Sequence, residues 1–207
     1  MTNYETLLDR DFDWALSEGS RHFECSNAVH ETLRRLAQRL DELGVDYAVV
    51  GAMAMFFHGY RRFTLDVDVI VTPHGLSVVE DMLVDHGFLR EPSRRYRLRD
   101  VSTGVRVDLL VAGAPLGGGG RAEMAIPDPS AAVAMGHGVR VLELSHLIEL
   151  KLATGQSRSR MQDLADVQAM IRVLDLPMDH RERIHPSLQD SFDRLWEYAQ
   201  IAKLDDY

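Results

Sequence analysis

The sequence predicts an α+β protein, in which a mixed sheet is covered by helices and followed by a helical C-terminal subdomain. A strand–helix pattern comes first, strands follow, and helical patterns fill the last third of the chain. Residues 64–71 and 105–111 alternate apolar and polar side chains with the period of two that is typical of half-buried strands. After residue 145, apolar residues recur at helical spacing. This order places a sheet-forming core before a helical appendage.

The composition is that of a folded chain in a reducing compartment. Hydrophobic residues make up 45% of the 207 residues and charged residues 27%, which is ordinary for a globular protein. Cys25 is the single cysteine, so no disulfide forms within the chain. The first twenty residues carry acids and have no apolar run of a signal peptide, and no segment approaches the ~18 apolar residues of a membrane span. We therefore expect a cytoplasmic protein that has no membrane partner.

The charge balance limits how the chain could bind nucleic acid. The net charge of −9 and the pI near 5.4 argue against a protein that coats nucleic acid through bulk electrostatics. Basic residues are nevertheless concentrated locally, and the densest cluster comprises Arg94, Arg95, Arg97 and Arg99. Two interpretations stay open for this cluster: a strand with a solvated arginine face, or a contact for a polyanionic acceptor such as an RNA end.

The first half of the chain contains the predicted sheet. Residues 1–26 are expected to form a short helix or an arm, and residues 27–43 a helix that Ser26 or Asn27 caps and Gly44 ends. The remaining segments are a strand at 47–50, a helix at 52–58, a strand at 64–71, a helix at 75–86, and strands at 94–99 and 105–111.

The second half is predicted to be mainly helical. The glycine-rich segment 113–120 lacks the Gly-Lys-Ser/Thr ending of a P-loop, so no phosphate-binding role is assigned to it. Helices are expected at 146–154, capped by Ser145, at 160–174 and at 187–203.

Three aspartates are the candidate chemical groups. Asp66 and Asp68 lie on one face of a predicted strand, and Asp108 has the same relation to the apolar side of another strand. If the two strands are neighbours, all three carboxylates point to one side, where they would raise one another's pKa unless a cation intervenes. Clustered carboxylates favour Mg²⁺ or Mn²⁺, and paired metals of this kind serve phosphoryl or nucleotidyl transfer. The alternative is that Asp-x-Asp marks only a solvated strand face.

A longer pattern around these acids resembles a known superfamily. Gly51-Ala52 is followed by thirteen residues and then by Asp66-Val67-Asp68 between apolar residues, which is similar to the signature of the DNA polymerase β-like nucleotidyltransferases. His58-Gly59, with Arg62 and Thr64, resembles the abortive-infection (AbiEii-like) type, a group containing toxins of toxin–antitoxin systems. The downstream residues that continue this likeness are Leu150-Lys151-Leu152-Ala153, Arg158, Arg160 and 163–167. The likeness covers roughly residues 30–175.

The resemblance implies a fold and a metal site. It implies a polymerase β-like nucleotidyltransferase fold, with an arm at 1–26, a catalytic core at 27–125 and a helical subdomain at 126–207 that completes the nucleotide site. Asp66 and Asp68 would hold Mg²⁺ or Mn²⁺, and Asp108 would be the third acid, as a metal ligand or as the base for the acceptor hydroxyl.

The resemblance also implies a nucleoside triphosphate site. Gly51 would turn the chain so that the next helix presents its N-terminal amides to the phosphates. Ala52 stands where the motif has glycine or serine, so only its backbone amide would contribute. The other residues implied at the nucleotide are Arg62, Thr64 and Lys151, which reach toward it, and Asp163 and Asp166, which brace the site.

Structural interpretations stay open for several of these residues. Gly51 alone is also typical of a strand-to-helix turn. Lys151 lies on the apolar side of its helix, where a lysine either extends past the edge of the core or points into a cleft. Asp163 and Asp166 fall in the first turns of a helix, where acids offset the helix dipole without any further role.

Two functions follow from these expectations. The first is an enzyme that moves a nucleoside monophosphate from an NTP to an acceptor hydroxyl, with an RNA 3′ end or a protein preferred over a small molecule. Such an enzyme could be the toxin of a pair with an antitoxin partner. The second is a non-catalytic nucleotide- or partner-binding subunit of a two-component system, and an antibiotic nucleotidyltransferase is a further alternative.

Overall fold

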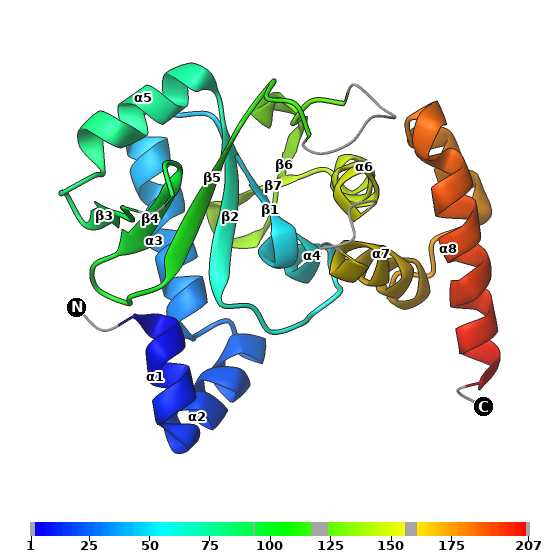
Figure 1. Ribbon diagram of the computed structural model, residues 1–207, viewed down its shortest axis with the longest axis horizontal. Helices are drawn as coiled ribbons and strands as arrows, with labels where there is room; N and C mark the ends of the chain where they lie inside the picture. The colour runs from blue at the N-terminus through cyan, green and yellow to red at the C-terminus, as the bar shows by residue number, and fades with distance from the viewer. Residues whose placement is uncertain (1–2, 93, 117–123, 156–160, 206–207) are drawn as a thin grey trace.

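A seven-stranded mixed sheet forms the centre of the computed structural model, which describes residues 3–92, 94–116, 124–155 and 161–205 (Figure 1). The order across the sheet is β3-β4-β5-β2-β1-β7-β6. β2 runs parallel to β5 and β1 runs parallel to β7, whereas the other neighbouring pairs are antiparallel. The strands are β1 (Tyr47–Val50), β2 (Asp66–Val71), β3 (Phe88–Arg90), β4 (Arg97–Asp100), β5 (Arg106–Val111), β6 (Ala132–Ala134) and β7 (Arg140–Leu142). The predicted α+β class with a mixed sheet is confirmed.

Helices cover both faces of this sheet. In Figure 1, α3 and α5 lie on one side of β2 and β5, and α4 and α6 lie on the other, with α7 and α8 stacked further out. The α-helices are α1 (Tyr4–Arg10), α2 (Phe12–Phe23), α3 (Ala28–Glu42), α4 (Gly51–His58), α5 (Pro73–Met82), α6 (Leu144–Gly155), α7 (Met161–Val173) and α8 (Pro186–Asp205). Short 3₁₀ helices are η1 (Pro129–Ala131), η2 (Gly136–Gly138) and η4 (Met178–Arg183).

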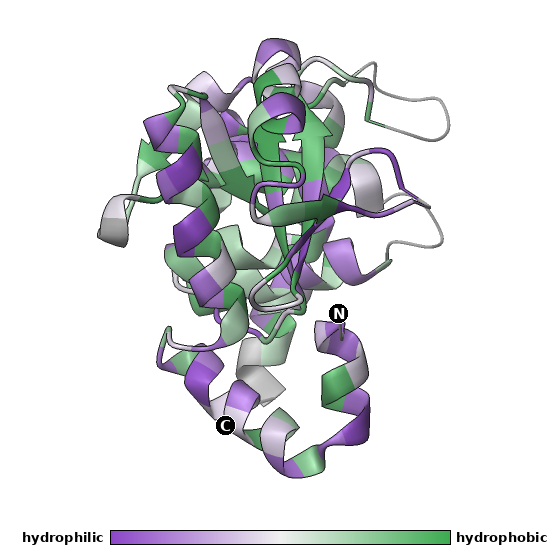
Figure 2. Ribbon diagram, turned by 90° about the vertical axis from the view of Figure 1, so that its left-hand side faces the viewer, coloured by the Kyte–Doolittle hydropathy of each residue, from purple (hydrophilic) through white to green (hydrophobic). Residues whose placement is uncertain are grey.

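The predicted alternation along β2 and β5 separates a core face from a site face. Val67, Val69, Val71 and Val107 are fully buried, and a Cβ added to Gly75 of α5 would lie 3.6 Å from Val71 Cβ. The acids on the opposite face lie on the α4 side. In Figure 2 the central strands are green, between helices that carry purple residues on their outer turns.

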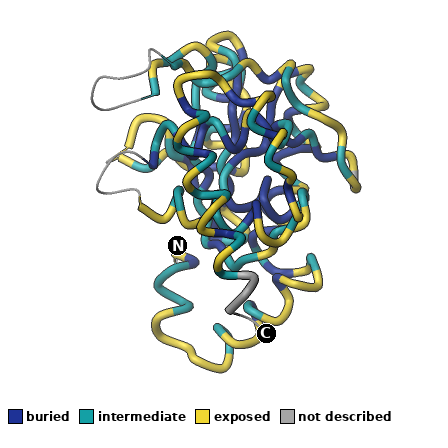
Figure 3. The backbone as a smooth tube through the Cα atoms, turned by 90° about the vertical axis from the view of Figure 1, so that its right-hand side faces the viewer, coloured by how far each residue is buried: buried dark blue, intermediate teal, exposed yellow. Residues whose placement is uncertain are grey.

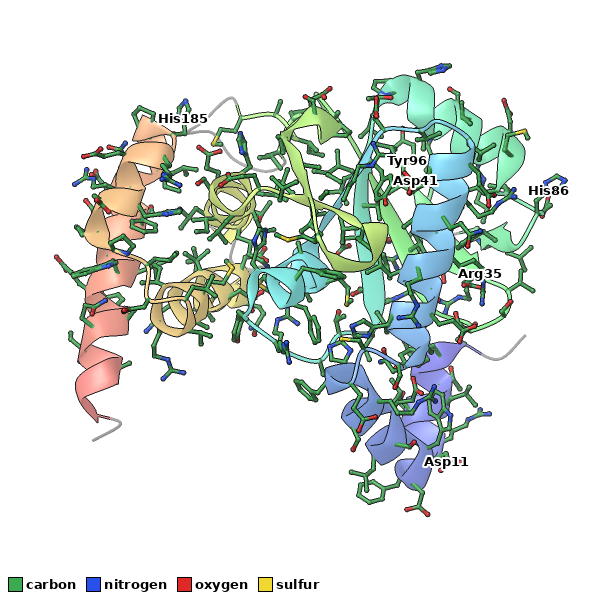
Figure 4. The ribbon with its side chains drawn as sticks, turned by 180° about the vertical axis from the view of Figure 1, so that it is seen from behind. Asp11, Arg35, Asp41, His86, Tyr96 and His185 are labelled. Atoms are coloured by element: carbon green, nitrogen blue, oxygen red, sulfur yellow. The ribbon has the colours of Figure 1, made fainter. Side chains whose placement is uncertain are left out.

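The N-terminal region is more ordered than the sequence indicated. It forms two helices that meet at Asp11, whose carboxylate accepts a hydrogen bond of 3.0 Å from Trp14 N–H and so caps α2 (Figure 4). Tyr4 is fully buried, and its backbone N–H donates to the carbonyl of Gly104 at 3.2 Å. Figure 3 shows that much of this helix pair is nevertheless exposed. The two helices dock through a few anchoring residues.

Several predicted boundaries are wrong. The helix expected at 75–86 ends at Met82, because Asp85 and Gly87 adopt positive φ angles of 62° and 107° that turn the chain into β3. Ser145 is a buried residue of α6 and not its cap. Instead, the carboxylate of Glu143 accepts hydrogen bonds from the backbone N–H groups of Ser145 and His146, at 2.9 and 3.4 Å.

Other predictions agree with the structure or fall outside it. Asn27, not Ser26, caps α3, and Gly44 follows that helix with φ 64°. Of the glycine-rich segment, residues 117–120 lie outside the described residues. The division at residue 125 stays a prediction, although β7 lies beyond it and pairs with β1. In the described part of the chain, no helix is long and apolar enough to span a membrane.

Candidate active site

Parallel pairing of β2 and β5 brings the predicted acids to one side of the sheet. In the register of this pair, Asp68 lies opposite Asp108, and Asp66 lies opposite Arg106. Asp66, Asp68 and Asp108 all line one cavity of about 920 Å³. The predicted juxtaposition of the acids on neighbouring strands is therefore present, and it follows from alternation and register together.

Arginine side chains form ion pairs with two of these three carboxylates, those of Asp108 and Asp66. Arg97 of β4 donates from Nε and Nη2 to the two oxygens of Asp108, at 2.6 and 2.9 Å. Arg106 donates from Nη2 to Asp66 Oδ2 at 3.2 Å, and Thr64 Oγ1 donates to Asp66 Oδ1 at 2.8 Å. The hydrogen bond to Asp108 holds the pKa of Arg97 above its usual range.

Gly51 places the start of α4 directly against the acids. Its φ of 63° is a left-handed conformation, and a Cβ added there would lie 2.0 Å from Asp68 Oδ2. Val50, the residue before α4, has an aliphatic side chain that cannot accept a hydrogen bond from the first amides of the helix. Gly51 and Ala52 line the cavity, so α4 begins at the cavity wall.

A second cluster closes the cavity on the side of α6 and α7. Lys151 is 5% exposed, and its Nζ donates to Asp163 Oδ1 at 3.0 Å and to Asp166 Oδ2 at 2.7 Å. Arg62 forms a bidentate pair with Asp166, at 3.0 Å for each bond. Lys151 therefore lines the cavity with its ammonium group held by two carboxylates, and Asp163 and Asp166 pair with basic side chains. The roles that the resemblance implies for these residues at a nucleotide stay predictions.

The charge state of Asp166 follows from these contacts. The carboxylate is fully buried, which opposes ionisation, but the Lys151 charge and the hydrogen bonds from Arg62, Lys151 and Gln162 outweigh burial. The pKa of Asp166 is consequently below its usual range. Lys151, Arg62 and Asp166 therefore form an ion-pair cluster at the wall of the cavity.

Most of the predicted site residues lie around the same cavity. The cavity lining includes Gly51, Ala52, Arg62, Thr64, Lys151, Asp163 and the three acids, while Asp166 lies behind Lys151 and Arg62. Arg158 and Arg160 lie outside the described residues, and their part in the site stays a prediction.

The interpretation of the arginine cluster as a solvated strand face is wrong for two of its members. Arg97 and Arg99 pair with carboxylates, and Arg99 is only 7% exposed. Arg94 and Arg95 precede β4, are exposed and line the cavity, with the Arg95 guanidinium 5.2 Å from the centre of the Tyr96 ring. Arg106 had no predicted role, although it precedes Asp108 by two residues and so shares its face of the strand.

The donor set is chemically suited to a hard divalent cation. Three carboxylates face one cavity, and such oxygen ligands are those that Mg²⁺ and Mn²⁺ prefer. Over the described ranges, however, no three acidic, histidine or cysteine side chains converge in a metal-holding arrangement. Arg97 and Arg106 instead engage Asp108 and Asp66. The residues therefore fit a divalent cation by the type of their donor atoms, and not by their arrangement in this structure.

Fold and site together define an α+β protein with an acid-lined cavity that has cations around its wall. No protein-family model matches the sequence, and no curated protein matches it either. The chain is similar in structure to an antigenic nucleotidyltransferase-like protein from Paracoccidioides brasiliensis, with 19% identity, coverage of 85% of this chain and 87% of that one, and a TM-score of 0.43.

Two further solved structures resemble the chain. One is ANT(2″)-Ia in complex with adenylyl-2″-tobramycin, with 14% identity, coverage of 85% of this chain and 98% of that one, and a TM-score of 0.40. The other is the Thermotoga maritima CCA-adding enzyme complexed with tRNA, with 17% identity, coverage of 83% and 42%, and a TM-score of 0.38. The predicted likeness to the abortive-infection type stays a prediction.

Proposed function

We propose that this protein is a metal-dependent nucleotidyltransferase that moves a nucleoside monophosphate from an NTP to an acceptor hydroxyl. The observation that carries the proposal is the placement of Asp68 opposite Asp108, with Asp66 on the same face and the glycine-started helix α4 against Asp68. Carboxylates beside a helix N-terminus and cations suit a bound metal–triphosphate, because each charge of that ligand meets its complement.

In the proposed reaction, the acceptor oxygen bonds to the α-phosphorus while the bond from that phosphorus to the bridging oxygen breaks. Pyrophosphate leaves with the electron pair, and the acceptor's proton passes to a base, for which Asp108 is the candidate. Bound Mg²⁺ or Mn²⁺, held by the three aspartates, would supply charge neutralisation at the phosphates. The α4 amides at Gly51 and Ala52, together with Arg62 and Lys151, orient the triphosphate.

The cavity wall favours a polyanionic acceptor. Arg94 and Arg95 are exposed at the cavity in a chain of net charge −9, and Tyr96 offers a ring beside them. Backbone phosphates and stacked bases bind such pairs of cations and rings. We therefore rank an RNA end above a protein, and either above an aminoglycoside-like small molecule. We also propose, more specifically, that the protein is a toxin. Expression of the wild-type protein should then arrest the growth of the host cell, and expression of the Asp68→Asn variant should not.

The experiment uses Mg²⁺, each α-labelled NTP in turn, and a cell extract, with label then counted in RNA, protein and small-molecule fractions. The expected result is label in one fraction, and a loss of more than about a hundredfold in Asp66→Asn/Asp68→Asn. Equal labelling by the variant, or no label from folded protein in any fraction, would contradict transfer at this site.

A specific observation favours a second candidate, a non-catalytic nucleotide-binding subunit. Arg97 and Arg106 already pair with Asp108 and Asp66, as fixed counter-ions would. The melting temperature distinguishes the two candidates from a protein that binds no nucleotide, because bound ligand stabilises the folded state by mass action. A rise with Mg²⁺ and NTP together, without label transfer, would favour the second candidate.

A further inference from the structure

An alternating chain of charges connects two of the candidate catalytic acids through the wall of the cavity. Four carboxylates and three guanidinium groups follow one another, each in contact with the next, and they come from α1, β2, β4, β5 and the segment between β3 and β4. In order, the members of this ion-pair chain are Asp66, Arg106, Glu5, Arg99, Glu91, Arg97 and Asp108.

The central arginine of this ion-pair chain is buried and is held by several hydrogen bonds. Arg99 donates from Nη1 to Glu5 Oε2 at 2.9 Å and to the Gly104 carbonyl at 2.6 Å, and from Nε to Glu91 Oε1 at 2.9 Å. Arg99 is 7% exposed. Glu5 belongs to α1, so the N-terminal helix pair supplies one of the fixed anions next to the candidate site.

The outer guanidinium groups each lie between a fixed glutamate and a candidate metal ligand. Arg106 Nε is 2.6 Å from Glu5 Oε1, and its Nη2 is 3.2 Å from Asp66 Oδ2. Arg97 Nη1 is 3.9 Å from Glu91 Oε2, while its Nε and Nη2 hold Asp108. Both arginines line the cavity. Each one therefore has a second ion-pair partner besides its aspartate, which is close for Arg106 and beyond hydrogen-bond distance for Arg97.

We infer that Arg97 and Arg106 are exchangeable counter-ions that hold Asp108 and Asp66 in the metal-free protein and bind the triphosphate once a metal takes those carboxylates. This inference rests on the proposed function. A carboxylate oxygen that accepts guanidinium N–H groups is hindered from binding a metal, so metal and arginine compete. A released guanidinium fork fits phosphate as well as carboxylate, and the triphosphate brings that new partner with the metal.

Glu5 and Glu91 are positioning residues in this scheme. They keep the released guanidinium groups at the cavity wall, where they would otherwise move into solvent. The N-terminal helix pair then acts on the site through Glu5.

The test measures two affinities of Arg97→Gln. The first is for Mn²⁺ alone, followed by the paramagnetic resonance signal of free Mn²⁺. The second is for tripolyphosphate at saturating Mn²⁺, followed by isothermal titration calorimetry. Loss of the competing fork should tighten Mn²⁺ binding about three- to tenfold, and loss of the phosphate contact should weaken tripolyphosphate binding by a similar factor. Opposite signs are the signature, because a merely structural residue would weaken both.

The matched control is Arg181→Gln. Arg181 lies in η4, where its Nη1 is 2.8 Å from Asp193 Oδ2, so the substitution removes the same charge and an ion pair from residues that do not line the cavity. Both affinities should stay within about twofold of wild type, since a distant exposed charge is screened. Arg106→Gln repeats the test on the Asp66 side, and serves if Arg97→Gln does not fold.

Each outcome decides between the inference and its premise. Weaker binding of both ligands, or no change in either, with wild-type protein that binds both, would overturn the exchange of counter-ions and leave the proposed function standing. Folded wild-type protein that binds neither Mn²⁺ nor tripolyphosphate would overturn the proposed function, and the inference with it.

Discussion

Gly51 is where a single residue type decides the geometry of the candidate site. Its φ of 63° disfavours any side chain, and an added Cβ would lie 2.0 Å from Asp68 Oδ2 and 2.9 Å from Asp68 Cγ. We expect Gly51→Ala to lose about 1 kcal/mol of unfolding free energy and to weaken Mn²⁺ binding by more than about tenfold, because the Asp68 carboxylate must move. Urea unfolding and Mn²⁺ titration measure the two effects.

The sequence itself provides the control for this substitution. Gly44 has φ 64°, and nothing lies within 4 Å of an added Cβ. Gly44→Ala should therefore show a similar loss of stability from the same backbone strain, with unchanged Mn²⁺ binding. If both variants bind Mn²⁺ like wild type, the contact between Gly51 and Asp68 has no role in the site.

Asp166 carries the second prediction at the residue scale. It is fully buried and accepts hydrogen bonds from Lys151, Arg62 and Gln162. Asp166→Asn removes the charge that balances Lys151, so the unfolding free energy should fall by about 3 kcal/mol, as when one partner of a buried pair is removed. Asp163→Asn, at a carboxylate that is 18% exposed, should cost less than about half of that. Equal losses in urea unfolding would contradict the ranking.

At the scale of elements, the sequence predicted those strands and helices whose apolar residues recur with a regular period. Alternation placed Asp66, Asp68 and Asp108 on the polar faces of two strands, and helical spacing located α3, α7 and α8. Which strands are neighbours is not encoded in either segment alone. The parallel register that puts Asp68 opposite Asp108 depends on α5 and the β3–β4 hairpin, which lie between β2 and β5 in the chain.

The elements and contacts that were missed have physical reasons. β3, β6 and β7 have three residues each, too few to show a period of two. Glu5 is far in sequence from its partners Arg99 and Arg106, and Glu91 meets Arg97 and Arg99 only because the chain turns back between β3 and β4, so neither glutamate carried a local signal. The alternation of Arg97 and Arg99 with Leu98 was visible, but a solvated face and a face paired with acids produce the same pattern.

The N-terminal helix pair gives a prediction at this scale. Asp11 caps α2 through the Trp14 amide, and loss of an N-cap costs about 1 kcal/mol. We expect Asp11→Ala to raise hydrogen-exchange rates of the α2 amides about fivefold and to leave the sheet amides unchanged, because α2 has a largely exposed outer surface. Asp13→Ala, in the first turn of the same helix, should have a smaller effect. Uniformly faster exchange would show that α2 opens only with the whole protein.

At the scale of the whole molecule, the helix pair, α3 and the site meet around one buried histidine. His22 is fully buried, and its Nε2 is 3.0 Å from the carbonyl oxygen of Arg62, the residue that pairs with Asp166. The His30 ring centre lies 4.9 Å away, and Glu18 and Asn27 are the other polar groups near His22. Through His22, the docking of α2 is connected to the loop that carries Arg62.

This arrangement makes stability depend on pH. Burial lowers the pKa of His22 below its usual 6.5 and outweighs the hydrogen bonds and the Glu18 charge. Burial likewise lowers the pKa of His180. Well above pH 6.5 both histidines are neutral in the folded and unfolded chains, and their contribution to stability is complete. As pH falls below 6.5, the unfolded chain takes up protons first, so the unfolding free energy falls until the folded-state pKa is passed.

We expect the melting temperature to fall as the pH is lowered from about 7.5 to about 5, well before Asp166 loses its contribution below its ordinary pKa of 3.8. His22→Gln keeps an N–H donor for the Arg62 carbonyl but cannot titrate, so its melting temperature should depend less steeply on pH in this range. The residual slope should include the part due to His180, and His22→Gln/His180→Gln should reduce it further. Calorimetric melting curves of the three proteins measure this, and parallel pH profiles would show that His22 takes up its proton equally in the folded and unfolded states.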